Sequence, residues 1–135
     1  SRGLGDVYKR QSDHTLGIEA RKNMQYQEGG MIAKRANLPN PQTLDDPELI
    51  NCIFYELAQP KGEISLLNGE ETLRVSEVGG AEVGSRLTFV SWTQPNAPYF
   101  CLEPWMSPPN APENKTVRKV APAARDEFTI EIDLA

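Results

Sequence analysis

The chain has 135 residues, of which 14 are basic and 19 are acidic, so its formal net charge is −5. This length corresponds to one domain or to part of one, and 39% hydrophobic with 24% charged residues is typical of a globular chain. The acidic balance argues against nucleic acid as a partner, because phosphate binding requires a basic face. Since the sequence has neither an apolar run long enough for a membrane helix nor a secretory signal, we expect a cytoplasmic protein with no membrane partner.

The first eleven residues, SRGLGDVYKRQ, read unlike the rest of the chain. They have no sustained periodicity and resemble a translated sequencing adapter, so we interpret residues 1–11 as a non-native segment. A natural basic N-terminal arm is the alternative interpretation. On the first interpretation, residues 12–135 are expected to be the C-terminal part of one domain.

Residues 12–47 are polar, with scattered apolar side chains and the breakers Gly29-Gly30, Pro39 and Pro41. A stretch of this length without a clear period predicts a loop that serves a function or is covered by a partner. Alternatively, its packing partners lie outside these 135 residues.

Beyond Pro47 the pattern becomes that of short strands. Five segments share this character: 51–57, 63–67, 71–77, 86–92 and 99–103. Asn68-Gly69 predicts a hairpin turn between the second and third of them. In the third, Leu73 and Val75 are expected on one face, with Arg74 and Ser76 on the other.

The tail DEFTIEIDL alternates most clearly, with Phe128, Ile130, Ile132 and Leu134 separated by polar residues. This is the period of a half-buried strand. Many short strands, turn residues between them and no convincing helix predict an all-β fold, an antiparallel β-sandwich or barrel.

Cys52 and Cys101 both lie in apolar runs, where a free thiol usually behaves as a small buried hydrophobe. Two cysteines without a CxxC pair form neither a disulfide framework nor a zinc motif. We therefore expect no metal site.

The segment from Ala97 to Trp105 carries the most informative residues. Strand alternation places Tyr99, Cys101 and Glu103 on one face, and Glu103 is the only charge between positions 97 and 111. Because Pro104 is expected to end the strand, the carboxylate of Glu103 should emerge at the rim of a sheet. A carboxylate among apolar groups is a candidate general base, although a glutamate that points into water fits the composition too. Trp105 offers a flat apolar face for a sugar ring, or belongs to the core.

The segment PYFCLEPW, followed by SPPNA, resembles the closing motif of the aldose 1-epimerases, or galactose mutarotases. The Asp-rich turn and strand LDDPELINCIF upstream agree, so that the resemblance covers about residues 40–135. It implies a galactose mutarotase-like β-sandwich, here in incomplete form, and an isomerase that interconverts the α and β anomers of a free aldose such as glucose or galactose. The resemblance further implies that Glu103 is the general base, that Asp46 or Asp45 grips sugar hydroxyls, and that no metal or organic cofactor is needed.

In that family a histidine protonates the ring oxygen, whereas the only histidine here is His14, which lacks the surroundings of the family motif. We therefore expect the 135 residues alone to be inactive, and their uncovered strand edges to favour self-association. One alternative is a hexose-6-phosphate 1-epimerase, for which the only close basic pair after the motif is Arg118-Lys119. Another is a non-catalytic carbohydrate-binding β-sandwich with Trp92, Tyr99 and Trp105 as its platform.

Overall fold

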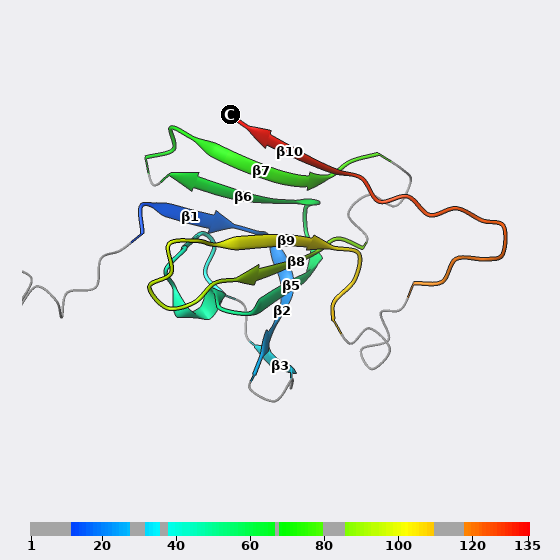
Figure 1. The fold of residues 1–135 in the computed structure, drawn as a ribbon, viewed down its shortest axis with the longest axis horizontal. Helices are drawn as coiled ribbons and strands as arrows, with labels where there is room; N and C mark the ends of the chain where they lie inside the picture. The colour runs from blue at the N-terminus through cyan, green and yellow to red at the C-terminus, as the bar shows by residue number, and fades with distance from the viewer. Residues whose placement is uncertain (1–11, 28–31, 36–37, 67, 80–85, 110–117) are drawn as a thin grey trace, which may run out of the picture.

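The computed structural model describes residues 12–27, 32–35, 38–66, 68–79, 86–109 and 118–135 (Figure 1). The segment 1–11, which the sequence sets apart, lies outside the described residues.

Two antiparallel five-stranded sheets make up the fold (Figure 1). The first, sheet A, has the spatial order β10 (Ile130–Leu134), β7 (Thr72–Glu77), β6 (Lys61–Leu66), β1 (His14–Gly17) and β4 (Gln42–Thr43). The second, sheet B, has the order β3 (Ile32–Arg35), β2 (Ala20–Tyr26), β5 (Cys52–Leu57), β8 (Thr88–Trp92) and β9 (Cys101–Trp105). The predicted antiparallel β-sandwich is confirmed.

The helical structure of the described chain is one short 3-10 turn, η3 (Pro47–Leu49). Within those same residues, no helix combines the length and the apolar character needed to cross a membrane.

The β6–β7 hairpin forms at the predicted Asn68-Gly69 turn. Gly69 has a φ of 74°, a left-handed conformation that glycine adopts without steric cost, and its N–H donates to the Leu66 carbonyl at 2.9 Å. The two strands pair with Ile64 opposite Leu73 and Gly62 opposite Val75. Leu73 and Val75 therefore share one face, as alternation predicted.

Residues 12–47 are not the loop that their polar composition predicted, because β1 to β4 lie within them. These strands gain their stability from long-range pairing: β1 lies between β4 and β6, and β2 lies between β3 and β5. Only Leu16 is buried in the four residues of β1, so no local alternation announces the strand. Tertiary context decides such a segment more than its own pattern does.

The core between the sheets is a cluster of eight buried residues: Leu16, Ile18, Leu49, Cys52, Phe54, Val75, Leu87 and Phe89. A second cluster, which we call the outer-face cluster, comprises Met24, Ile53, Tyr55 and Val90. It lies on the opposite side of sheet B, because Ile53 and Tyr55 alternate with Cys52 and Phe54 along β5. The unbroken apolar run of β5 thus reflects burial on both faces of the sheet.

The alternating tail forms β10, but half of its apolar side chains are not buried as expected. Phe128 and Ile130 pack against the core, whereas Ile132 is 69% exposed and Leu134 is 65% exposed. The reason is positional, since β10 is the outermost strand of sheet A.

Candidate functional site

Glu103 lies on the outer face of sheet B, the face that carries the outer-face cluster. Its cross-strand neighbour is Val90 on β8, which in turn pairs with Ile53 on β5. Leu102, the next residue along β9, packs instead against the core between the sheets. The alternation predicted for this segment is therefore confirmed.

Pro104 does not end the strand, contrary to the sequence-based expectation. β9 continues to Trp105, and Pro104 pairs with Phe89 across the sheet. Among the described strands β9 has β8 as its one neighbour, and a proline is tolerated at such an edge. Glu103 consequently projects from the middle of an edge strand rather than from the end of one.

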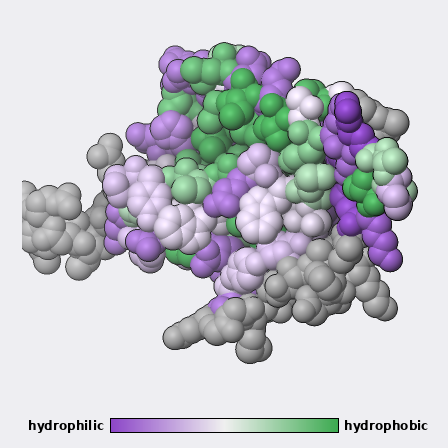
Figure 2. Space-filling view, turned by 45° about the vertical axis from the view of Figure 1, so that its right-hand side comes forward, coloured by the Kyte–Doolittle hydropathy of each residue, from purple (hydrophilic) through white to green (hydrophobic). Residues whose placement is uncertain are grey.

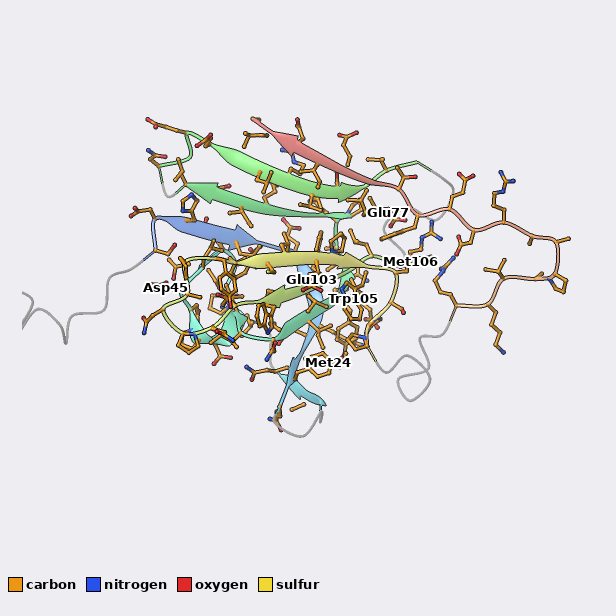
Figure 3. All side chains as sticks on the ribbon, viewed as in Figure 1. Met24, Asp45, Glu77, Glu103, Trp105 and Met106 are labelled. Carbon is orange, nitrogen blue, oxygen red and sulfur yellow. The ribbon has the colours of Figure 1, made fainter. Side chains whose placement is uncertain are left out.

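Glu103 receives a hydrogen bond from Trp105, whose Nε1 donates to Oε2 at 3.1 Å. The two side chains can meet because residues two apart in a strand face the same way, and Figure 3 shows them together. Glu103 is half-buried and the Trp105 indole is 39% exposed, so Trp105 does not belong to the sandwich core. The carboxylate thus has a directed polar partner beside the apolar Val90.

A second aromatic feature lies at the start of β9. The rings of Trp92 and Tyr99 stack with centroids 5.5 Å apart and an interplanar angle of 24°. Trp92 pairs with Cys101, which places it on the same face as Glu103. The hydroxyl of Thr93 donates to the Tyr99 carbonyl at 2.7 Å and fastens the loop that carries Tyr99. Aromatic surfaces therefore precede and follow Glu103 along β9.

Asp45 and Asp46 lie in a different place, at the η3 turn. Asp46 is the N-cap: its Oδ1 accepts from the Glu48 N–H at 3.0 Å and its Oδ2 from Gln42 Nε2 at 2.9 Å. Asp45 Oδ2 accepts from the Ser12 N–H at 2.9 Å. Figure 3 shows Asp45 at the end of the sandwich, apart from Glu103 and Trp105.

This end of the sandwich holds an open groove of about 530 Å³. Asp45, Asp46 and His14 line it together with the β8–β9 loop. His14 is the first residue of β1 in sheet A and is exposed. It therefore does not share the outer face of sheet B with Glu103.

Cys52 and Cys101 are not joined by a disulfide, and they lie on opposite faces of sheet B. Cys52 is fully buried in the core, whereas Cys101 is half-buried on the Glu103 side. Within the described ranges, no three histidine, cysteine, aspartate or glutamate side chains converge as a metal site.

No pattern in the sequence predicted the charge cluster that joins β7 to the segment before β10. Arg86 Nε donates to Glu77 Oε2 at 2.9 Å, and the same guanidinium contacts the carboxylate of Asp126 and the carbonyl of Glu127. The side chains of Glu77 and Arg86 are 0% and 6% exposed. The hydrogen bonds that Arg86 donates to Glu77 and Asp126 raise the pKa of Arg86, and the one to Asp126 lowers the pKa of that carboxyl. Only the fold brings these groups together.

The fold defines an antiparallel β-sandwich whose outer sheet face carries a half-buried carboxylate among aromatic rings. A solved structure of similar fold is that of the Slr1438 protein from Synechocystis sp. PCC 6803, with a TM-score of 0.66 and 22% sequence identity. The match covers 94% of this chain and 41% of the Slr1438 chain, so this chain spans less than half the length of that protein. At this identity the likeness shows the fold alone. No protein-family model and no curated protein matches the chain.

Proposed function

We propose that Glu103 is the general base of a carbohydrate isomerase of the aldose 1-epimerase type, which interconverts the α and β anomers of a free aldose. One observation carries the proposal: a half-buried carboxylate projects from the middle of β9 and is oriented by the Trp105 indole. The resemblance of the surrounding PYFCLEPW segment to the closing motif of the aldose 1-epimerases supports the same role.

In the proposed reaction Glu103 removes the proton from the anomeric hydroxyl. The bond between the anomeric carbon and the ring oxygen breaks, the ring oxygen takes a proton from an acid, and an open-chain aldehyde forms. Rotation about the bond next to the aldehyde presents its other face to the hydroxyl. On closure this hydroxyl returns its proton to the acid, and Glu103 returns its proton to the anomeric oxygen, which gives the second anomer. Because His14, the only histidine of the chain, lies in sheet A, we propose that the acid comes from polypeptide outside these 135 residues.

The proposed role of the aromatic residues is to bind the apolar face of the sugar ring. The exposed indole of Trp105 lies next to the carboxylate, and the stacked Trp92 and Tyr99 offer a second surface along β9. We leave Asp45 and Asp46 out of the reaction. The Asp46 carboxylate accepts hydrogen bonds from Glu48 and Gln42 that hold the η3 turn, and the Asp45 carboxylate accepts one from the Ser12 N–H.

Two alternatives remain distinct from this proposal. A hexose-6-phosphate 1-epimerase needs basic side chains that converge on a phosphate. Arg118 lies within 3.3 Å of Asp126 and takes part in the charge cluster, which weakens that reading. A non-catalytic carbohydrate-binding sandwich is favoured by the exposure of Tyr99 and Trp105, 42% and 39%.

Polarimetry of freshly dissolved α-D-glucose and α-D-galactose tests the proposal. Because we expect the 135 residues alone to be inactive, the assay uses a longer protein that contains this chain. This protein is compared with its Glu103→Gln variant and with Glu131→Gln, a change of an exposed glutamate on β10. We expect faster relaxation that the Glu103 variant loses by about a hundredfold or more and the control retains. Equal rates for the Glu103 variant and the parent would overturn the assignment.

Sugar binding separates the alternatives. Titration of the 135-residue chain with glucose, galactose and glucose 6-phosphate, followed by tryptophan fluorescence, reports on Trp92 and Trp105. Saturable binding without faster anomer exchange in the polarimeter would favour the binding module. A preference for the phosphorylated sugar in both assays would favour the hexose-6-phosphate epimerase.

A further inference from the structure

The inner face of sheet A, the face toward sheet B, is apolar across β6, β7 and β10 but is covered only in part. Along one row of paired residues, Leu134 lies beside Leu73, Leu73 beside Ile64, and Ile64 beside Leu16. Exposure rises along that row from 3% for Leu16 to 65% for Leu134. Figure 2 shows hydrophobic residues gathered at the top of the molecule, where these strands lie in Figure 1.

The covered part ends where sheet B ends. In Figure 1, β9 is the strand of sheet B drawn nearest to sheet A, and β1, β6, β7 and β10 lie above it in that order, with β7 and β10 farthest away. Within the described chain β9 pairs only with β8, so its other edge has unpaired backbone groups. Each strand added to that edge would widen sheet B by about 4.8 Å. Added strands would therefore lie over the uncovered apolar face.

We propose that this face and the β9 edge are a docking surface for further β-strands of the same fold. The occupant is polypeptide equivalent to the part of Slr1438 that lies outside the match, since this chain corresponds to 41% of that protein. The exposed Ile132 continues the core, because it pairs with the buried Val75. An apolar face that continues the core can pack against the apolar face of strands added to sheet B.

The docking surface adjoins the candidate site. A strand paired with β9 would run beside Glu103 and could bring the acid and further sugar contacts to the same face. This consequence rests on the proposed function, whereas the docking surface itself does not.

Light scattering after size exclusion tests the docking surface. The probe is the part of the Slr1438 polypeptide that lies outside the structural match, and it is refolded together with the 135-residue chain. Ile132→Thr/Leu134→Thr makes the proposed contact polar and keeps a strand-forming residue. Glu131→Thr/Asp133→Thr changes the other face of the same strand and is the matched control. We expect a one-to-one complex. The Ile132→Thr/Leu134→Thr variant, the inner pair, should lower its affinity about tenfold or more, and the Glu131→Thr/Asp133→Thr variant, the outer pair, should leave the affinity unchanged.

Three outcomes would overturn the proposal. They are equal binding by the inner-pair variant, no complex with the parent chain, and a discrete dimer of the chain alone that the inner pair abolishes. The last would identify a second copy as the occupant. Since no sugar is present, these results are independent of the polarimetry: a chain that docks as expected while the Glu103 variant stays active would refute only the proposed function.

Discussion

Replacement of Arg86 by methionine removes a cation from the buried Glu77 carboxylate, whose side chain is 0% exposed. A buried ion that loses its partner costs about 3–5 kcal/mol, which is a large part of the 5–15 kcal/mol that stabilises a typical domain. The change also removes the contacts of Arg86 with Asp126 and with the Phe128 ring, which lies 5.5 Å from the guanidinium carbon. We therefore expect the thermal midpoint to fall by roughly 10–20 °C.

The measurement is chemical and thermal unfolding followed by far-ultraviolet circular dichroism. Arg118→Met is the matched control, because that guanidinium is 30% exposed and its pair with Asp126 should contribute less than about 1 kcal/mol. The double variant Arg86→Met/Glu77→Met removes both charges and should be more stable than Arg86→Met alone. A loss below about 1 kcal/mol in Arg86→Met would refute this reasoning.

Three further predictions concern packing, pH and the η3 turn. Gly62→Ala should cost about 1–3 kcal/mol in urea unfolding, because its Cβ would lie 3.1 Å from the Phe89 ring, whereas Gly17→Ala, with a nearest atom at 3.6 Å, should be neutral within error. Because Arg86 holds the pKa of Asp126 below its usual value, the charged carboxylate stabilises the fold at neutral pH, and this stability is lost as pH falls below about 4. Thermal midpoints from pH 7 to pH 3 should fall less in Asp126→Asn than in the parent; parallel curves would contradict this. Asp46→Ala should lose about 1 kcal/mol through the missing N-cap, with Asp46→Asn closer to the parent in the same urea assay.

The sequence predicted the strands whose side chains alternate locally and whose turns have the right residues. The hairpin at Asn68-Gly69 needed no tertiary information, since that dipeptide adopts the turn itself. The strands in residues 12–47 were missed, because β1 and β2 pair with β6 and β5, which lie far along the chain. Their polar side chains give no periodic signal of that pairing.

The sequence predicted only part of the candidate site. Alternation was sufficient to place Glu103 on the face opposite Leu102, but the resemblance that grouped Glu103 with Asp45 did not reveal that they lie apart. The pair of Arg86 with Glu77 was also invisible, because a segment with glycines separates the two residues and only packing brings them together. Residues assembled across the sandwich have no local pattern.

The placement of the two thiols on opposite faces of sheet B makes the chain suitable for selective chemical labelling. Cys101 is half-buried beside Trp92 and should react with an alkylating reagent in the folded protein. Cys52 is 0% exposed and should react only when the two sheets separate. A fluorophore could thus be attached next to Glu103 without mutagenesis. The rate at which Cys52 is modified would then record how often the two sheets separate.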